Sequence, residues 1–510
     1  MPYQRMDEQI VRENTEQRLT VRFGSALVLS SAVIAYTAEK MVRKHHPSSL
    51  KRRQPRKRAR EGAHLEGFHN CLLNVADLDE FISVELFLPK FWNTKLLVCG
   101  VGEFGQLGLG EDQVCVNKFN EVEFKEPLNI VMVAAGGVHA LFLTDTGVVY
   151  SCGCNDDGPL GRQCLDENGA EVCDDTDFTF RPVQFKTEEL KLHGRIVMIT
   201  TGDCHCAALT EKGSVFVWGT FRGKEGPIGL MIDDTSGQII KKAIRPHILV
   251  DYRVHHIVKI SSGTDHLAML DRDGSVWTVG ATTVGQLGRL RVTADMECTS
   301  HRVLSRLLTP AKVNEVIKRP KASKVYPLRF KNVFSTAYAV FALSFDDDVI
   351  CWGMNNYFQL GIQPTEDGRL FEPFPVFSSK LNAGNRYNAF AGEHHILALS
   401  VTGVVYGIGR GLDGRLGLGR SVDVEEDAAK IGPFSASSVC GVAAAGSCSF
   451  AWTEDGSGFA WGANIGGLLG LPVPEDAVVN KPKRIPLSRD GHVVQIATNG
   501  VFVMMLTSGD

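Results

Sequence analysis

The stretch LLVCGVGEFGQLGLG at Leu96–Gly110 decides the fold, because a short apolar strand in it runs into glycine and then into an apolar-Gly pair. The pattern occurs seven times, with strand-ending glycines at Gly100, Gly153, Gly219, Gly280, Gly353, Gly409 and Gly462. The successive spacings are 53, 66, 61, 73, 56 and 53 residues. Repeats of this size, made of short strands and glycine turns, bury their apolar faces only by stacking on neighbours, as in propellers and solenoids.

Each repeat contains a tight turn, a β-rich strand and a small-residue segment that leads to another apolar strand. One copy reads Arg272-Asp273-Gly274, then SVWTVG, and SSGTDHLAML is the matching small-residue segment. The first copy lacks a hairpin ahead of it, whereas the chain ends with the inner strands VVQIATNGVFVMMLTSGD. We therefore predict an all-β, seven-bladed β-propeller closed by pairing of the N- and C-terminal strands, which removes exposed sheet edges.

Charge divides the chain into a basic tail and an acidic body. Residues 1–63 hold 14 Lys/Arg and 6 Asp/Glu, a net charge of +8, so the remainder carries −12 of the total of −4. We predict a disordered basic tail with a short apolar run at 1–65, a linker packed on the propeller rim at 66–93, and the propeller at 94–510. The apolar run Phe23–Ala38 has sixteen residues, short of the roughly twenty that a membrane span needs. A short helix is favoured over an anchor, and no membrane partner is expected.

The centre of the tail is RKHHPSSLKRRQPRKRAR, in which nine of eighteen residues are basic and none is acidic. Its basic residues are Arg43, Lys44, Lys51, Arg52, Arg53, Arg56, Lys57, Arg58 and Arg60. Such a run is typical of a nuclear import signal, of an arm that binds nucleic acid, or of both, with a plain solvated linker as the alternative. The thirteen cysteines include no CxxC pair, so we expect reduced thiols in a nuclear or cytosolic protein.

Several motifs that could carry chemistry are better explained by the repeat. Gly100-x-Gly102-x-x-Gly105 matches a dinucleotide fingerprint, but a turn-like QLGLG follows it instead of the helix that would hold pyrophosphate. Cys204-His205-Cys206 is one copy of the repeated inner segment and lacks a second ligand pair. We therefore predict no cofactor, no metal site and no covalent catalysis, and we expect no enzyme in that sense.

The third copy departs from the others in its loop length. Six copies keep four residues between the strand-ending glycine and the next turn, but the third has six, Thr220–Glu225. The hairpin is made of Thr220, Phe221, Arg222, Gly223, Lys224, Glu225, Gly226 and Pro227. We expect it to project from the blade with its aromatic, Arg and Lys side chains, while Pro227 stiffens its base. It is a candidate probe for a partner, and the alternative is a neutral insertion in a surface loop.

These repeats carry a family resemblance. The segments GQLGLG, CNDDGPLGR, AGGVH, TGDCH, VFVWGTFRGKEGPIGL, SSGTDHLAML and GQLGRL are similar to the regulator of chromosome condensation family, from about Leu96 to Leu506. Its chromatin-bound members exchange guanine nucleotide on the small GTPase Ran. The resemblance implies that Thr220–Pro227 is the β-wedge pressed against the GTPase. It also implies an exchange face lined by Glu103, His139, Asp203, Asp265, Arg289 and His394, with Asp265 the most important for turnover.

The repeat itself also supports such a face. Asp203, Asp265 and His394 fall in equivalent segments of three blades, so a closed ring gathers them near its centre. Two positions depart from the family pattern, since Phe358 and Phe502 stand where it has His. They suggest a divergent partner surface or a weaker exchanger.

The resemblance further implies a mechanism and partners. The protein would bind nucleotide-free Ran more tightly than loaded Ran and thereby lower nucleotide affinity. It would attach to nucleosomes through the basic tail on DNA and through a loop on the histone acidic patch, for which Arg302 and Arg306 are candidates. A nuclear, chromatin-associated protein carried by import receptors is expected. The alternative is a propeller scaffold that binds chromatin or another protein without exchange activity.

Overall fold

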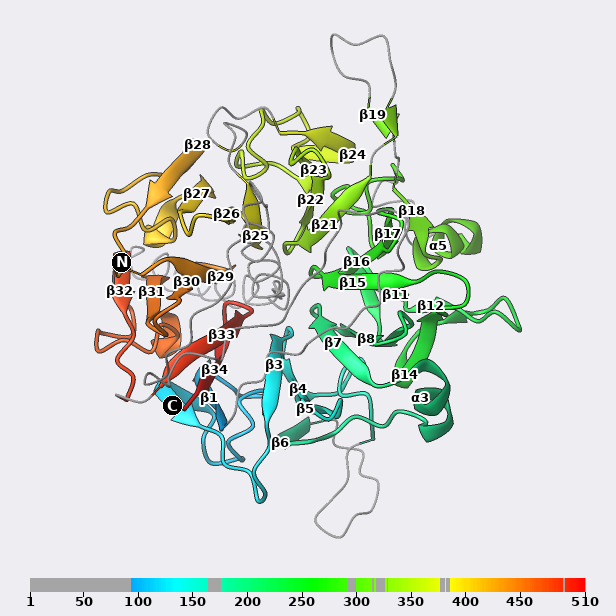
Figure 1. Cartoon of the computed structure of the whole chain (residues 1–510), viewed down its shortest axis with the longest axis horizontal. Helices are drawn as coiled ribbons and strands as arrows, with labels where there is room; N and C mark the ends of the chain where they lie inside the picture. The colour runs from blue at the N-terminus through cyan, green and yellow to red at the C-terminus, as the bar shows by residue number, and fades with distance from the viewer. Residues whose placement is uncertain are drawn as a thin grey trace, which may run out of the picture.

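Seven four-stranded antiparallel sheets stand around a central axis and form a closed ring (Figure 1). The computed structural model describes residues 93–163, 176–291, 300–313, 316–317, 326–327, 329–376, 381, 386–435, 437–488 and 491–509. The predicted basic tail, the run Phe23–Ala38 and the linker up to residue 92 lie outside the described residues. Among the described residues, no helix is long and apolar enough to cross a membrane.

Six blades are consecutive in sequence, and we number them in chain order. Their strands, written from the axis outward, are: blade 1, β3 (Ile130–Ala135), β4 (His139–Thr144), β5 (Val149–Cys154) and β6 (Thr176–Pro182); blade 2, β7 (Ile196–Thr201), β8 (His205–Thr210), β9 (Val215–Gly219) and β14 (Ala243–Val250); blade 3, β15 (Ile257–Ser262), β16 (His266–Asp271), β17 (Val276–Gly280) and β18 (Ala311–Lys312). The remaining three are: blade 4, β21 (Phe330–Ser335), β22 (Ala339–Ser344), β23 (Val349–Met354) and β24 (Arg369–Pro375); blade 5, β25 (Tyr387–Gly392), β26 (His395–Ser400), β27 (Val405–Arg410) and β28 (Val424–Ile431); blade 6, β29 (Val439–Ala445), β30 (Cys448–Thr453), β31 (Gly458–Ala463) and β32 (Val478–Arg484).

Blade 7 closes the ring with both ends of the propeller. Its strands from the axis outward are β33 (His492–Thr498), β34 (Phe502–Ser508), β1 (Thr94–Val101) and β2 (Cys115–Glu121). Strand β1 pairs with β34 in one register from Thr94 opposite Ser508 to Gly100 opposite Phe502. This confirms the predicted seven-bladed propeller and its closure, which leaves neither terminal strand with an open inner edge.

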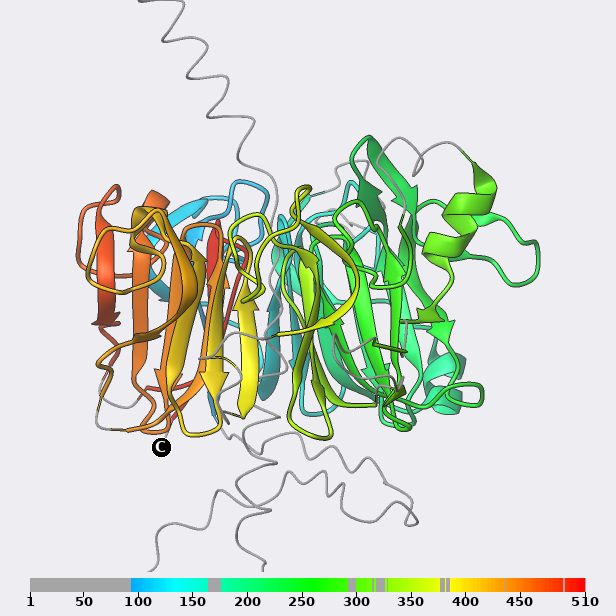
Figure 2. The same ribbon diagram turned by 90° about the horizontal axis from the view of Figure 1, so that it is seen from above.

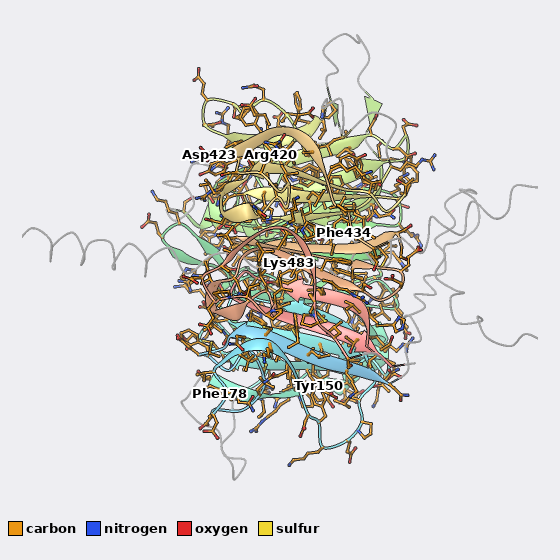
Figure 3. The ribbon with its side chains drawn as sticks, turned by 90° about the vertical axis from the view of Figure 1, so that its left-hand side faces the viewer. Tyr150, Phe178, Arg420, Asp423, Phe434 and Lys483 are labelled. Atoms are coloured by element: carbon orange, nitrogen blue, oxygen red, sulfur yellow. The ribbon has the colours of Figure 1, made fainter. Side chains whose placement is uncertain are left out.

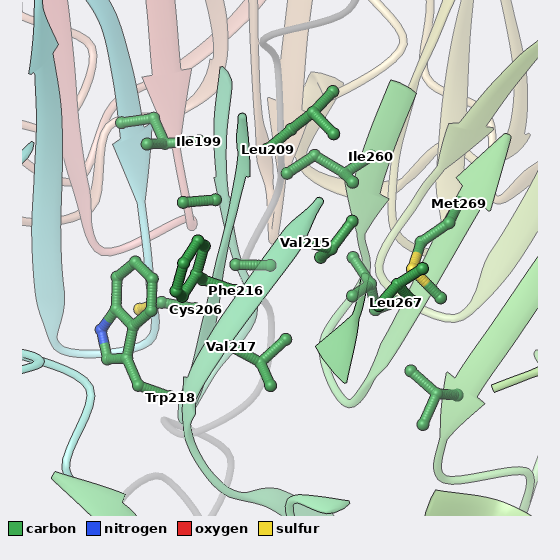
Figure 4. Close-up of a cluster of buried hydrophobic side chains, with 14 of the residues drawn as sticks. Ile199, Cys206, Leu209, Val215, Phe216, Val217, Trp218, Ile260, Leu267 and Met269 are labelled. Atoms are coloured by element: carbon green, nitrogen blue, oxygen red, sulfur yellow. The ribbon is translucent and has the colours of Figure 1, made fainter. Parts of the chain in front are cut away.

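Apolar side chains fill the spaces between blades. In Figure 4, Phe216 lies with Ile199 on one side of blade 2, and Val217 lies on the other side, towards Leu267 and Met269 of blade 3. All five side chains are fully buried. Because the strands bury both faces, their sequences are nearly continuous apolar runs. Burial on this scale supplies most of the favourable free energy of folding.

The recurring glycines have a packing role between blades. Trp218 of blade 2 donates its indole N–H to the carbonyl of Pro159 in the loop of blade 1, at 2.7 Å. Gly161 in that loop has a φ of +66°, and a Cβ there would lie 2.9 Å from Trp218 Nε1. Trp352 and Trp461 make the same bond to the loops of the blades before them. The motif glycine therefore lets the loop of one blade receive the tryptophan of the next.

The outer strands carry polar side chains on the rim. Figure 3 views this rim and labels Lys483 on β32 and Phe178 on β6. The smaller elements outside the seven sheets are α3 (Thr187–His193), α5 (His301–Leu308), the 3₁₀ turns η1 (Leu412–Gly414) and η2 (Ile465–Gly467), and the pairs β10 (Phe221–Gly223) with β11 (Gly226–Gly229), β12 (Met231–Ile232) with β13 (Ile239–Ile240) and β19 (Val316–Ile317) with β20 (Tyr326–Pro327). The first two pairs are excursions from blade 2, between β9 and β14.

Candidate partner-binding face

Backbone hydrogen bonds link the turns between the first two strands of blades 1 to 5 into a chain. The N–H of Gly137 donates to Asp203 O at 3.3 Å, that of Asp203 to Thr264 O at 2.9 Å, and that of Thr264 to Ala337 O at 2.9 Å. Ala337 N–H then donates to Gly392 O at 3.1 Å. These bonds fix the turns of blades 1 to 5 at one end of the ring, which we call the wedge face.

Asp203 and Asp265 occupy neighbouring positions of this turn, not the same one. Asp203 donates its N–H to Thr264 O, and these two residues occupy the same position of the turn. Asp265 is one residue further on, so it corresponds to Cys204 in blade 2 and to His394 in blade 5. The phenol of Tyr338 in blade 4 has its pKa raised by burial first and then by Glu393, Asp203 and Asp265. Carboxylates from blades 2, 3 and 5 therefore lie near one buried phenol, and Arg410 and Arg415 lie near the adjacent His394.

The lengthened loop of blade 2 forms a two-stranded hairpin, the wedge. Arg222 pairs with Pro227 and Gly223 with Gly226 across β10 and β11. In the edge-on view, the green segment that holds this hairpin rises past the ends of the neighbouring blades (Figure 2). Lys224 and Glu225 at its tip are exposed, and so is Pro227 opposite Arg222.

Two carboxylates from different blades hold Arg222. Asp265 Oδ1 accepts a hydrogen bond from the Arg222 backbone N–H at 2.8 Å. Asp157 Oδ2 in the loop of blade 1 accepts from Arg222 Nη1 at 2.6 Å. The wedge is thus attached to the blades on both sides of its own blade. Asp157 had no assigned role in the sequence analysis, although it lies in the quoted segment CNDDGPLGR.

The root of the wedge is buried, which corrects one sequence-based expectation. Phe221 was expected to project as an aromatic contact, but its side chain is fully buried. Its ring centroid lies 4.4 Å from that of His205, at the boundary between blades 2 and 3. Thr220 is also buried, and its hydroxyl donates to Lys241 O at 2.7 Å. The first two residues of the predicted probe therefore anchor it.

Helix α5 supports the back of the wedge. Its buried residues Leu307 and Leu308 face β11 and β12, and a Cβ on Gly229 of β11 would lie 2.9 Å from Leu308 Cδ1. Arg289 Nη2 donates to Arg306 O at 3.1 Å and to Thr309 O at 3.2 Å at the end of the helix. Burial and the nearby Arg306 lower the pKa of Arg289 to about 10. Arg289 was expected on the exchange face, and the structure uses it to fix α5.

The predicted histidines lie in different environments. His139 is fully buried between blades 1 and 2, where its Nε2 lies 2.6 Å from Thr201 Oγ1, and burial lowers its pKa to about 3. This corrects its expected place on the exposed face. His394 is partly exposed, between the rings of Tyr338 at 5.8 Å and Tyr357 at 5.4 Å. Burial, Arg410 and Arg415 lower the pKa of His394 to about 4, so it is neutral at pH 7.

Three further positions complete the comparison with the sequence-based expectations. Glu103 is exposed in the loop of blade 7. Phe502 is fully buried opposite Gly100, at the position that His139 and His205 occupy in their blades, so it changes the core and not an exposed surface. Phe358 is half-buried with a φ of +63°, at the place where Gly105 and Gly285 stand in other loops. A phenylalanine in this left-handed region is strained.

The segment Cys204-His205-Cys206 does not bring its side chains to a common point. Cys206 Sγ donates to Pro159 O at 3.3 Å, and the His205 ring packs on Phe221. Arg302 and Arg306, the candidate histone contacts, are exposed one helical turn apart on α5. The basic tail from Arg43 to Arg60 lies outside the described residues.

Comparisons with known proteins agree with this architecture. Residues 95–505 match the family described as RCC1-like domain. The chain is 37% identical over 387 residues to the human protein named Regulator of chromosome condensation, covering 75% of this chain and 83% of that protein. It is 28% identical over 441 residues to the Saccharomyces cerevisiae Guanine nucleotide exchange factor SRM1, covering 79% and 85%.

A solved structure is similar over the same region. The crystal structure of Prp20p from Saccharomyces cerevisiae, described together with its binding properties to Gsp1p and histones, superposes with a TM-score of 0.68 at 26% identity. The match covers 82% of this chain and 92% of that one. The similarity therefore extends around the whole ring and is not limited to a few blades.

Proposed function

The chain belongs to the RCC1-like domain family, and we propose that it is a guanine-nucleotide exchange factor for a GTPase of the Ran type, acting at chromatin. The human relative is named Regulator of chromosome condensation, and the yeast relative is named a guanine nucleotide exchange factor. Family membership alone does not select this activity, because propellers of one fold serve many functions. The site must carry the argument.

The observation that carries the proposal is the hydrogen bond from Arg222 N–H to Asp265 at 2.8 Å. Asp265 belongs to blade 3 and the wedge to blade 2, so this carboxylate fixes the direction in which the hairpin leaves the ring. A hairpin fixed beside carboxylates of neighbouring blades fits a partner that is both penetrated and held by charge. Carboxylates there would pair with basic groups of the GTPase that nucleotide phosphates otherwise occupy.

Exchange of this kind requires no bond to be made or broken in this chain. The protein would bind the nucleotide-free GTPase more tightly than the loaded form, and by linkage the nucleotide's affinity falls by the same factor. The wedge tip at Lys224–Glu225 would displace the loops that hold Mg²⁺ and phosphate. Asp203 and the neutral His394 would contact the partner around it.

The experiment measures release of fluorescent GDP from Ran at substoichiometric amounts of the full chain. Asp265→Ala is expected to slow release about 10- to 100-fold, since a charged hydrogen bond contributes about 1.5–3 kcal/mol and each 1.4 kcal/mol is a factor of ten. Asp273→Ala, in the exposed opposite turn of blade 3, is the matched control and should keep the wild-type rate. If the wild-type protein does not accelerate GDP release, the alternative function remains, a propeller scaffold that has no exchange activity.

Chromatin attachment is a separate part of the proposal. The histone-binding properties described for Prp20p belong to that protein. In this chain the supporting features are the basic run Arg43–Arg60 and the exposed pair Arg302 and Arg306 on α5. Nucleosome binding should weaken steeply as salt rises, and deletion of residues 43–60 should flatten that slope. Arg302→Ala with Arg306→Ala should weaken binding at every salt concentration, and Arg272→Ala on the opposite face should not. Import-receptor binding and nuclear localisation are expected to depend on the same run.

A further inference from the structure

We propose that Asp157 is a positioning residue for the wedge, which acts by orienting Arg222 and does not itself contact the partner. This inference rests on the proposed exchange function and adds a residue from blade 1 to a device built on blades 2 and 3. Asp157 Oδ2 lies 2.6 Å from Arg222 Nη1, and Asp157 is the less exposed partner, at 19% against 44%.

The loop that carries Asp157 is stiff. Asn155 is buried, accepts from Leu160 N–H at 3.0 Å and donates to Arg162 O at 2.9 Å, so its side chain bridges the whole turn. Gly158 N–H donates to Asn155 O at 2.8 Å. Lys242 Nζ, directly before the outer strand β14 of blade 2, donates to Asp156 O at 2.9 Å. Asp157 is therefore presented to Arg222 from a fixed backbone, as a positioning group requires.

Arg222 is held at two points by neighbours on opposite sides. Asp265 of blade 3 takes its backbone N–H, which sets the path of β10, and Asp157 of blade 1 takes its guanidinium, which sets the tilt of the hairpin. Phe221 fixes the root and α5 supports the back, but Lys224 and Glu225 at the tip are exposed. The ion pair is consequently the last attachment before the part of the wedge that would enter the GTPase.

Energetics separate this role from a purely structural one. A partly exposed ion pair contributes little to stability, because water screens it. Its effect on partner binding by a projecting hairpin is different. A hairpin that has lost its orientation must be ordered again when the partner binds, and this ordering costs binding free energy. If the wedge makes its full contacts only as nucleotide leaves, the loss lowers kcat and leaves KM nearly unchanged.

The test uses Asp157→Asn in the full chain, with Asp156→Asn, one residue earlier and exposed, as the matched control. We expect kcat for GDP release from Ran to fall about fivefold, with KM and the unfolding midpoint changed little, because about 1 kcal/mol corresponds to that factor. Asp157→Glu should restore most of the rate. Arg222→Gln, which removes the same pair from the exposed side, should reproduce the defect if Asp157→Asn folds poorly.

A second readout needs no GTPase and separates the two hypotheses. Trypsin cuts after Arg222 and Lys224, so a loosened wedge in Asp157→Asn should be cut several-fold faster than in wild type or Asp156→Asn. Faster cutting with no exchange by the wild-type protein would preserve the positioning role and overturn the proposed function. Asp157→Asn that matches Asp156→Asn in both exchange and proteolysis would overturn the positioning role, as would an equal fall in stability and rate.

Discussion

Two neighbouring boundaries between blades use the same histidine in different ways. Between blades 1 and 2, His139 Nε2 lies 2.6 Å from Thr201 Oγ1. Between blades 2 and 3, the equivalent residues are His205 and Ser262, but within the described residues neither imidazole nitrogen nor Ser262 Oγ has a hydrogen-bond partner. There the Phe221 ring packs against His205 instead, with the two ring planes tilted by 46°.

The difference shows how one blade boundary also holds the root of the wedge. The first boundary pairs one His139 nitrogen, Nε2, and leaves Nδ1 without a partner among the described residues. The second leaves both His205 nitrogens and Ser262 Oγ without one there, which costs free energy, and it also holds the root of the wedge. Burial of Phe221 offsets that cost. At this boundary the burial of Phe221 therefore both anchors the wedge and joins the two blades. Three measurements can test this dual role.

The largest effect is expected from Phe221→Ala. The side chain is fully buried, so its loss should lower the free energy of unfolding by about 3–5 kcal/mol. Exchange activity should fall as well, because the wedge loses its root. Urea denaturation measures the first effect and GDP release the second. Pro227→Ala, at an exposed position of the same hairpin, is the control and should stay within about 0.5 kcal/mol. A Phe221→Ala protein of wild-type stability would contradict the anchoring role.

An intermediate effect is expected from acid. Burial lowers the pKa of both His139 and His266 to about 3, so the folded protein keeps them neutral while the unfolded chain protonates them near pH 6.5. Stability is therefore fully present above pH 6.5 and falls as the pH drops towards 3, by at most about 1.4 kcal/mol per pH unit for each histidine. Denaturation midpoints between pH 7.5 and 4.5 measure it. His139→Gln should flatten the profile, and an unchanged slope would argue against a neutral buried imidazole.

The smallest effects compare the two boundaries directly. Thr201→Val keeps the shape but leaves the buried His139 nitrogen without its hydroxyl partner, so it should destabilise by about 1–2 kcal/mol. Ser262→Ala removes a hydroxyl that has no partner among the described residues and should change stability by less than about 0.5 kcal/mol. If the two substitutions lower the free energy of unfolding equally, the two boundaries are alike and Phe221 does not distinguish the second one.

The sequence determined the ring and the location of its exception. Seven copies of one glycine pattern can bury their strands only by stacking, and the mismatch of the two ends predicted the pairing of β1 with β34. The loop Thr220–Glu225 is two residues longer than the matching loop of the other six copies, which all have four residues. This difference in loop length located the wedge. These are local features, and counting along the chain is enough to find them.

Only the tertiary structure decided which of the candidate side chains are exposed. Phe221, His139 and Phe502 looked like surface contacts and are buried, while Arg289 holds α5 and Asp157, without an assigned role, holds the wedge. Each outcome depends on a neighbouring blade some fifty or more residues away: Thr201 for His139, Gly280 for Phe221 and Asp157 for Arg222. A periodic sequence fixes how each blade is built, but the direction of a side chain at a boundary is settled by what the next blade places against it.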